Sequence, residues 1–210
     1  MFITLEGPDG SGKTRQINPL ADFLCEQGYR VFTAREPGGT SIGDQVRKIL
    51  MKLDNTSMRP RTETLLFCSA RAQLVDEVIR PHLEKGDVVL LDRYADSTMA
   101  YQGYGHQNDL NLIRNLLDFA TGGLKPDLTL LLDIDPQVGL RRRQDGGGEW
   151  NRLDAYQLQY HRRVRQGYLE MAKAEPERWR VIDAGQPPDV VQSEIRKVLL
   201  LYLSKLSKYK

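Results

Sequence analysis

The sequence predicts an α/β protein in which a parallel sheet lies between two layers of helices, a three-layer arrangement. Segments that suit helices separate five short apolar runs of strand-like composition, which are Phe2 to Leu5, Val31 to Thr33, Val88 to Leu91, Leu128 to Leu132 and Trp179 to Ile182. The third and fourth runs are almost wholly apolar, as expected of parallel strands that helices cover on both faces. They end at Asp92 and Asp133. Because open α/β sheets bind ligands at the carboxyl ends of their strands, we expect a site near these carboxylates.

Glycine and proline residues mark the ends of the expected helices. Gly28 ends the first helix, and Gly86 ends a long helical segment that starts at about Thr62. Pro136 and Pro187 open later helices, because proline is favoured in the first turn. The chain shows no internal repeat, and its 210 residues are most simply one domain with a substantial core.

Charge and hydropathy exclude several classes of partner. The formal net charge is +2, from 30 basic and 28 acidic residues, so no overall field attracts nucleic acid or a membrane surface. Every apolar run is shorter than the roughly 18 residues of a membrane span, and the first residues already form a strand, which leaves no room for a signal peptide. We therefore expect a cytoplasmic protein that contacts neither nucleic acid nor membrane.

The cysteines and histidines do not suggest a metal centre. Cys25 falls on the apolar side of the first expected helix, and with Cys68 it is interpreted as one of two core thiols in a reducing compartment. His82, His106 and His161 lie far apart, show no metal-ligand spacing and receive no role.

The stretch GPDGSGKT has the spacing of a phosphate-binding loop, in which glycines let backbone N–H groups converge on a polyphosphate. It lies between a β-prone run and a helical pattern, as that motif requires, which disfavours the alternative of an ordinary turn. Lys13 would reach the β and γ phosphates of ATP, and the Thr14 hydroxyl would hold Mg²⁺. The expected ATP-binding residues are Gly7, Pro8, Asp9, Gly10, Ser11, Gly12, Lys13 and Thr14.

A carboxylate and a guanidinium stand side by side where the third strand ends. Asp92 can hold Mg²⁺ through water, and Arg93 can form two parallel bonds to a phosphate. A guanine-reading loop of the Asn-Lys-x-Asp type is missing, because the nearest string, LKPD at Leu124 to Asp127, lacks the asparagine and precedes a strand. These features favour a phosphoryl-transfer enzyme over a switch GTPase.

Six segments, taken in order, resemble the bacterial thymidylate kinase family: EGPDGSGKT, REPGGT, LLFCSAR, LDRYADSTMAYQG, KPDLTLLLD and NRLDAYQLQYHRRVRQGYLEMA. The resemblance covers nearly the whole chain. It implies a P-loop nucleoside monophosphate kinase fold with a short lid, transfer of the ATP γ-phosphoryl group to dTMP with Mg²⁺, and a homodimer. Two alternatives stay open: a kinase of the same fold acting on another nucleoside or monophosphate, and a nucleotide-dependent switch module.

The resemblance also implies roles for residues on the acceptor side. Asp9 resembles the acid that holds the sugar 3′-hydroxyl or the metal region of the acceptor, although an aspartate here could also serve the turn. Glu36, with Pro37, resembles the acceptor-side loop. Arg47 resembles the arginine that grips the acceptor phosphate, and on a helix it could equally be a solvated charge.

The expected base site is formed by Phe67 and Arg71, which are four residues apart and share one helix face. By resemblance, the ring of Phe67 stacks on thymine and Arg71 donates to a base carbonyl. From its spacing alone, a phenylalanine here is more often a core residue.

The segment DSTMAYQ completes the expected contacts with the acceptor, which are Ser97, Thr98, Tyr101 and Gln102. By resemblance, Thr98 is the polar group near the pyrimidine edge. Tyr101 resembles the residue that crowds the sugar 2′ position and so favours deoxyribose, and its alternative is a packed core tyrosine.

The source of the transition-state charge is where this sequence departs from the family. There, a basic residue sits either just after the acid of the phosphate loop or in the middle of the lid. Here the first position is Gly10, and the middle of the lid reads DGGGE, so neither carries that charge. Within a lid at about residues 141 to 152, Arg143 and Arg152 are the first choices, ahead of Arg141, Arg142 and Arg15 of the phosphate loop. The expected catalytic residues are Lys13, Asp9, Arg93, Arg143 and Arg152.

Overall fold

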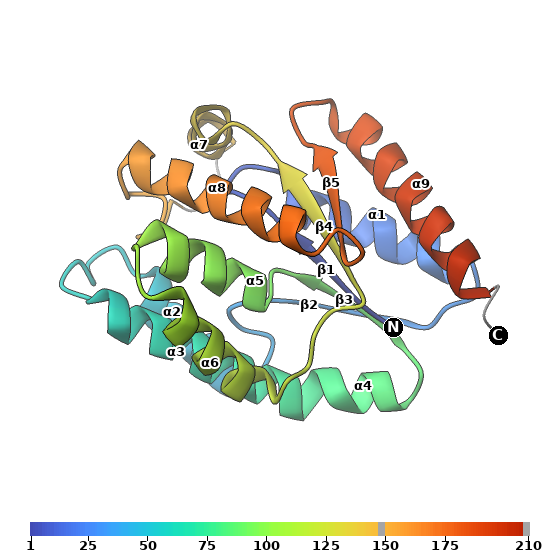
Figure 1. Cartoon of the computed structure of the whole chain (residues 1–210), viewed down its shortest axis with the longest axis horizontal. Coiled ribbons are helices and arrows are strands. Elements are labelled where there is room, and N and C mark those ends of the chain that lie inside the picture. The colour runs from blue at the N-terminus through green and yellow to red at the C-terminus, as the bar shows by residue number, and fades with distance from the viewer. Residues whose placement is uncertain (147–149, 208–210) are drawn as a thin grey trace.

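A five-stranded parallel sheet forms the centre of the protein in the computed structural model, which describes residues 1–146 and 150–207 (Figure 1). Its spatial order is β2-β3-β1-β4-β5. The strands are β1 (Phe2–Glu6), β2 (Val31–Arg35), β3 (Val88–Asp92), β4 (Leu128–Asp133) and β5 (Trp179–Asp183). All five apolar runs are therefore strands, and each extends to the charged residue that follows the run. The fold class expected from the sequence is confirmed.

The other elements connect and cover the strands. In chain order they are α1 (Lys13–Glu26), α2 (Ser41–Met51), α3 (Pro60–Leu74), the π-helical segment η1 (Val75–Ile79), α4 (Arg80–Glu84), α5 (Ala95–Thr98), the π-helical segment η2 (Met99–Gly105), α6 (Leu110–Thr121), α7 (Pro136–Asp145), α8 (Leu158–Ala174) and α9 (Pro188–Ser207).

Two hydrophobic layers hold the helices on opposite faces of the sheet, because successive strand side chains point to opposite sides. Ile3 and Leu5 belong to the cluster that also contains the apolar residues of α1 and α9. Phe2 and Leu91 pack on the other face with residues of α3 and η1, and Leu131 packs there with α8. The result is the three-layer arrangement seen in Figure 1.

Strand register brings three strand ends to one level. Arg35 of β2 and Leu5 of β1 both pair with Asp92 of β3. The loop that follows β1 therefore starts beside the end of β3, and the carboxyl edge of the sheet gathers the segments that carry the expected chemistry.

Most helix boundaries lie near their expected positions, and the lid is the exception. The long helical segment begins at Pro60, and α9 begins at Pro188, one residue after the expected proline. Helix α7 continues to Asp145. The sequence places a lid at about residues 141 to 152, and the first five residues of that stretch, 141 to 145, belong to this helix. Residues 147–149 of the expected lid lie outside the described residues.

One core assignment was wrong. Cys68 is buried, but Cys25 is exposed. The buried stripe of α1 follows Ile17, Leu20 and Leu24, and the next residue points away from it.

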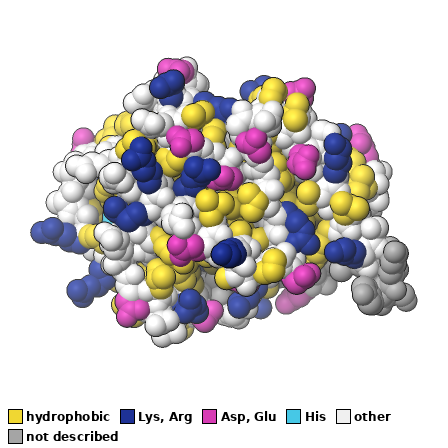
Figure 2. All heavy atoms as spheres, turned by 45° about the horizontal axis from the view of Figure 1, so that its top comes forward, with side chains coloured by type: hydrophobic (Ala, Val, Ile, Leu, Met, Phe, Trp, Pro, Cys, Tyr) yellow, Lys and Arg dark blue, Asp and Glu magenta, His cyan; other side chains and the backbone are white. Residues whose placement is uncertain are grey.

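The described helices include none that is long and apolar enough to cross a membrane. On the face drawn in Figure 2, basic and acidic side chains are interspersed.

Candidate active site

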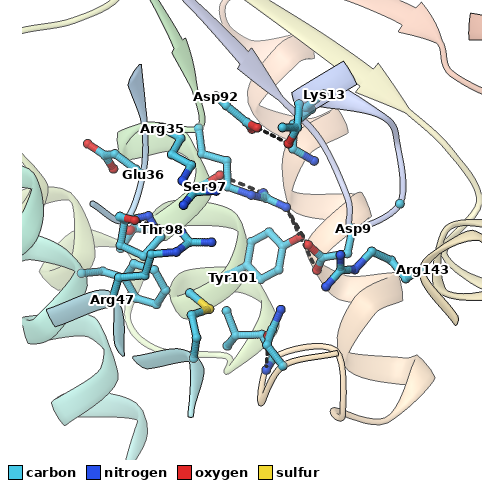
Figure 3. Close-up of a pocket in the computed structure, with 18 of the residues that line it drawn as sticks. Asp9, Lys13, Arg35, Glu36, Arg47, Asp92, Ser97, Thr98, Tyr101 and Arg143 are labelled. Atoms are coloured by element: carbon cyan, nitrogen blue, oxygen red, sulfur yellow. Dashed lines mark hydrogen bonds and ion pairs between the residues drawn. The ribbon is translucent and has the colours of Figure 1, made fainter. Parts of the chain in front are cut away.

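A cavity of about 520 Å³ opens at the carboxyl edge of the sheet (Figure 3). The expected residues that line it are Asp9, Gly10, Gly12, Lys13, Thr14, Glu36, Arg47, Phe67, Arg71, Asp92, Arg93, Ser97, Thr98, Tyr101, Gln102 and Arg143. The expected residues that do not line it, in the described part of the chain, are Gly7, Pro8, Ser11 and Arg152. The cavity is therefore continuous from the phosphate loop to the expected base site.

The phosphate loop owes its shape to glycines in the left-handed region. Gly10 has φ 75° and Gly12 has φ 88°, which other residues rarely adopt. Gly12 is the N-cap of α1, so the loop leads directly into the amino end of that helix, where backbone N–H groups favour an anion. At Gly10 there is also no room for a side chain, because a Cβ would collide with the backbone of Gly139 in α7.

Lys13 lies across its own loop. Its Nζ donates to the Gly7 and Pro8 carbonyls, both at 2.9 Å, and to the Ser11 hydroxyl at 3.1 Å. Burial, followed by the charge of Arg93, lowers the pKa of Lys13 to about 8. An incoming polyphosphate would replace these carbonyls with charged oxygens.

Thr14 and Asp92 meet beside the loop. The Thr14 hydroxyl donates to Asp92 Oδ2 at 2.5 Å. Mg²⁺ at nucleotide sites is usually held by one or two carboxylates, a hydroxyl and phosphate oxygens, so this pair suits that ion. The part of the chain that the structure describes holds no cluster of three or more His, Cys, Asp or Glu side chains able to bind a metal ion without phosphate.

Arg93, Asp9 and Tyr101 form a closed hydrogen-bonded triangle in the middle of the cavity. Arg93 Nη2 donates to Asp9 Oδ1 at 2.7 Å and to the Tyr101 hydroxyl at 3.1 Å, and that hydroxyl donates to Asp9 Oδ2 at 2.7 Å. Burial raises the pKa of Asp9, but the charges of Arg93 and Lys13 outweigh it and hold the pKa below its usual value. Asp9 is therefore an anion fixed between the two ends of the site.

A buried carboxylate that sequence reasoning did not select lies behind this triangle. Glu6 accepts from the Tyr94 backbone N–H at 2.7 Å, from the Ser97 hydroxyl at 2.6 Å and from the Tyr168 hydroxyl at 3.0 Å. The two hydroxyl oxygens in turn accept from Arg93 Nη1, at 3.1 and 3.2 Å. Burial, followed by the charge of Asp96, raises the pKa of Glu6 to about 7. Ser97 therefore holds Arg93 in place in this structure. In the sequence, Glu6 is marked only as a carboxylate that ends an apolar strand.

Three arginines converge near Asp92. Arg47 Nη1 donates to the Pro37 carbonyl at 2.9 Å. Arg35 and Arg47, labelled in Figure 3, line the cavity together with Arg93. Burial, followed by the charge of Arg35, lowers the pKa of Arg47. Like charges brought together in a cavity favour an anionic ligand. Sequence reasoning did not select Arg35, although it opens the REPGGT segment.

At the far end of the cavity Arg71 is almost fully buried, with 1% of its surface exposed. Its Nε and Nη2 donate to Glu36 Oε2, Nη2 also donates to the Tyr94 carbonyl, and Nη1 donates to the Thr98 hydroxyl. Phe67 lines the same end and packs with Leu50 and Leu153.

The expected lid arginines have different surroundings. Arg143 lines the cavity and is held by Asp154, with Nε to Oδ1 at 3.1 Å and Nη2 to Oδ2 at 2.5 Å. Arg152 is buried, with its Nη2 2.6 Å from Glu63 Oε2 and its Nε donating to the Leu50 carbonyl. The structure brings Arg143 to the cavity and turns Arg152 into the protein.

Fold and site together define a P-loop nucleotide kinase: a phosphate loop and an Asp-Arg pair meet at the carboxyl edge of a parallel sheet and face a cavity lined by both polar and apolar side chains. The family model described as "Thymidylate kinase" matches residues 5–195. The chain belongs to the thymidylate kinase family.

Named relatives agree over almost the whole length. The thymidylate kinase of Roseiflexus castenholzii is 50% identical over 218 residues, covering 98% of this chain and 95% of the relative. That of Deinococcus radiodurans is 49% identical, covering 93% and 94%. The crystal structure of thymidylate kinase from Ehrlichia chaffeensis superimposes with a TM-score of 0.76 at 36% identity, covering 95% of this chain and 98% of that one.

Proposed function

We propose that this protein transfers the γ-phosphoryl group of ATP to dTMP and so forms dTDP for dTTP synthesis. The observation that carries the proposal is one cavity with a phosphate loop at one end, the Phe67 and Arg71 pocket at the other, and Arg93 between them. An oxygen of the dTMP phosphate forms a bond to the γ-phosphorus, the bond from that phosphorus to the β–γ bridging oxygen breaks, and ADP leaves.

At the donor end, the chain supplies position and charge. The backbone N–H groups of the loop and the Lys13 ammonium would surround the β and γ phosphates. Thr14 and Asp92 would hold the Mg²⁺ that accompanies ATP, and the bound ion neutralises charge on the phosphate oxygens.

At the acceptor end, arginines would hold the dTMP phosphate. Arg93 is fixed by its bonds to Asp9 and Ser97, and Arg47 faces the same space. The Asp9 carboxylate would hold the sugar 3′-hydroxyl, and the neighbouring Tyr101 ring would occupy the space that a 2′-hydroxyl needs. Phe67 would stack on thymine, while Arg71, kept in place by Glu36, would donate to a base carbonyl.

Arg143 is the proposed source of the transition-state charge. It reaches the cavity from the end of α7, and Asp154 holds its guanidinium from the other side of the lid. The sequence analysis assigns Arg152 the same role, but in the structure its guanidinium pairs with buried Glu63, so Arg143 is the residue that we propose.

A coupled assay with ATP tests the function. Offered dTMP, dUMP, dCMP, dGMP and AMP separately, the protein should use dTMP with the highest kcat/KM. Higher kcat/KM on another acceptor would favour the alternative of a related kinase, and ATP turnover without any acceptor would favour a switch module. The named relatives do not favour either alternative.

We also propose a homodimer in the cytoplasm. Leu65 of α3 and Leu112 and Phe119 of α6 are 49%, 56% and 88% exposed, and α3 lies beside α6 (Figure 1). A second copy of the chain would cover these side chains. Sedimentation equilibrium should give twice the 24.0 kDa chain mass, and Phe119→Glu should shift it toward the monomer. A monomeric wild-type protein at micromolar concentration would contradict the dimer.

A further inference from the structure

A second buried carboxylate lies behind the base pocket, well away from the phosphates. Glu63, in the first turn of α3, has a fully buried side chain and collects hydrogen-bond donors from two other parts of the chain. Its Oε1 accepts from Gln102 Nε2 at 2.8 Å and from His106 Nε2 at 2.9 Å. Its Oε2 accepts from the Tyr156 hydroxyl at 3.1 Å and lies 2.6 Å from Arg152 Nη2. Glu63 therefore joins η2 to the segment that follows the lid.

The carboxylate stays ionised at neutral pH. Burial raises the pKa of Glu63, but the hydrogen bond and charge of His106, together with Arg152 and Gln102, outweigh it and hold that pKa below its usual value. An ionised carboxylate only accepts hydrogen bonds.

This fixes which way the Gln102 amide faces. Its NH₂ group must point at Glu63, because the opposite orientation would put two acceptors in contact in a buried place. The carbonyl Oε1 is then directed away from Glu63. Gln102 is 1% exposed and lines the cavity, so this pocket gains an acceptor with a set orientation.

Arg71 supplies the opposite polarity in the same pocket. Within residues 1–146 and 150–207, its bonds to Glu36 (two), Tyr94 and Thr98 use four of the five guanidinium N–H groups, which leaves one on Nη1. One donor and one fixed acceptor match a pyrimidine that carries a 4-oxo group and an N3–H, as thymine and uracil do. Cytosine presents a 4-amino donor and an N3 acceptor, so both contacts would be reversed.

We propose that Glu63 is a positioning residue that sets base selectivity, because it holds the Gln102 amide in the orientation that accepts 4-oxo pyrimidines and rejects 4-amino pyrimidines. This inference rests on the proposed function. It assigns the selectivity to a residue behind the pocket, which acts through Gln102.

The experiment compares kcat/KM for dTMP, dUMP and dCMP in the wild type and in Glu63→Gln. The neutral amide lets Gln102 turn over, so the preference for dTMP over dCMP should fall by about 10- to 100-fold, the range that one mispaired buried polar group costs. The preference for dTMP over dUMP should not change, because both bases carry the same 4-oxo and N3–H groups. An equal change in both ratios would indicate a collapsed pocket and overturn the proposal.

A double-mutant cycle separates positioning from a structural role. In the Gln102→Met background, Glu63→Gln should no longer alter the ratio of dTMP to dCMP, since there is no amide left to orient. A persistent effect would show that Glu63 acts by another route. Gln102→Met alone must lower that ratio, and an unchanged ratio overturns the proposal even if Glu63→Gln fails to fold. A wild-type protein that phosphorylates none of these acceptors instead contradicts the proposed function.

Discussion

At the phosphate end, the cavity is lined mainly by one short loop, with Asp9, Gly10, Gly12, Lys13 and Thr14 facing it, whereas the base end is assembled from side chains that are far apart in the chain. In the loop, the shape of the site comes mainly from the backbone, through glycines at positive φ and the amino end of α1. At the base end, Glu63 bonds to partners 39 and 93 positions away, at Gln102 and Tyr156. The difference implies that changes at the phosphate end alter turnover on every acceptor, whereas changes at the base end alter the choice among acceptors.

The largest expected effect is at the phosphate end, for Lys13→Ala. In the proposed mechanism the variant loses the charge that faces the transferring phosphates, so turnover on dTMP should become undetectable while the melting temperature changes little. Steady-state kinetics and thermal unfolding together measure this. Near wild-type turnover would remove the loop from the mechanism.

The lid comes next. Arg143→Ala should lower kcat at saturating ATP and dTMP by about 10³- to 10⁵-fold, the contribution of an arginine that stabilises the transferring group. Arg15→Ala is the matched control, because Arg15 also lines the cavity but lies after the phosphate loop, in the first turn of α1. A loss below tenfold for Arg143→Ala, with a large loss for Arg15→Ala, would move the charge to the phosphate loop.

Phe67 tests the base end of the cavity separately from the phosphate end. Phe67→Ala should weaken dTMP binding by about 5- to 150-fold, because stacking on a base contributes about 1 to 3 kcal/mol. ATP binding should change much less, and the melting temperature should fall because the ring also packs with Leu50 and Leu153. Calorimetric titration with each nucleotide measures the two affinities. Equal weakening of both would show that the ring serves only the core.

The smallest effect is a pH dependence of the phosphate end. In the proposed mechanism the charged form of Lys13 binds phosphate, and in the free protein this form is lost as pH rises through the Lys13 pKa of about 8. The kcat/KM for ATP should therefore be about tenfold lower at pH 9 than at pH 7. In the Lys13→Arg variant this fall in kcat/KM between pH 7 and pH 9 should disappear, whatever the absolute rate of the variant. A wild-type profile that stays flat to pH 9 would contradict the assignment.

What the sequence could predict follows the same division. The strands are visible because buried parallel strands are continuous apolar runs, and the phosphate loop is visible because all its parts are neighbours. Glu63 could not be recognised, since a glutamate in the first turn of a helix is ordinarily explained by the helix dipole. Its burial depends on Gln102, His106 and Arg152, which only the tertiary fold brings together.

The same reason accounts for the weaker sequence assignments. Arg152 sits in a charged, glycine-rich stretch that looks solvated, and its burial follows from the distant partner Glu63. Cys25 lies one residue past the buried stripe of α1, where helical periodicity alone does not fix the edge of the core. The roles of the expected site residues remain predictions that the variants above test.

The tight packing of Gly10 against Gly139 limits how this enzyme could be altered, by evolution or by design. Neither glycine has room for a side chain, since each would collide with the backbone that carries the other: Gly10 with Gly139, and Gly139 with Asp9. A single Gly10→Arg replacement would therefore push α7 away from the loop and move Arg143 with it. Moving the proposed catalytic charge from Arg143 to the loop would therefore require changes in both segments, not one substitution. The structural origin of this constraint is that neither residue carries a Cβ atom.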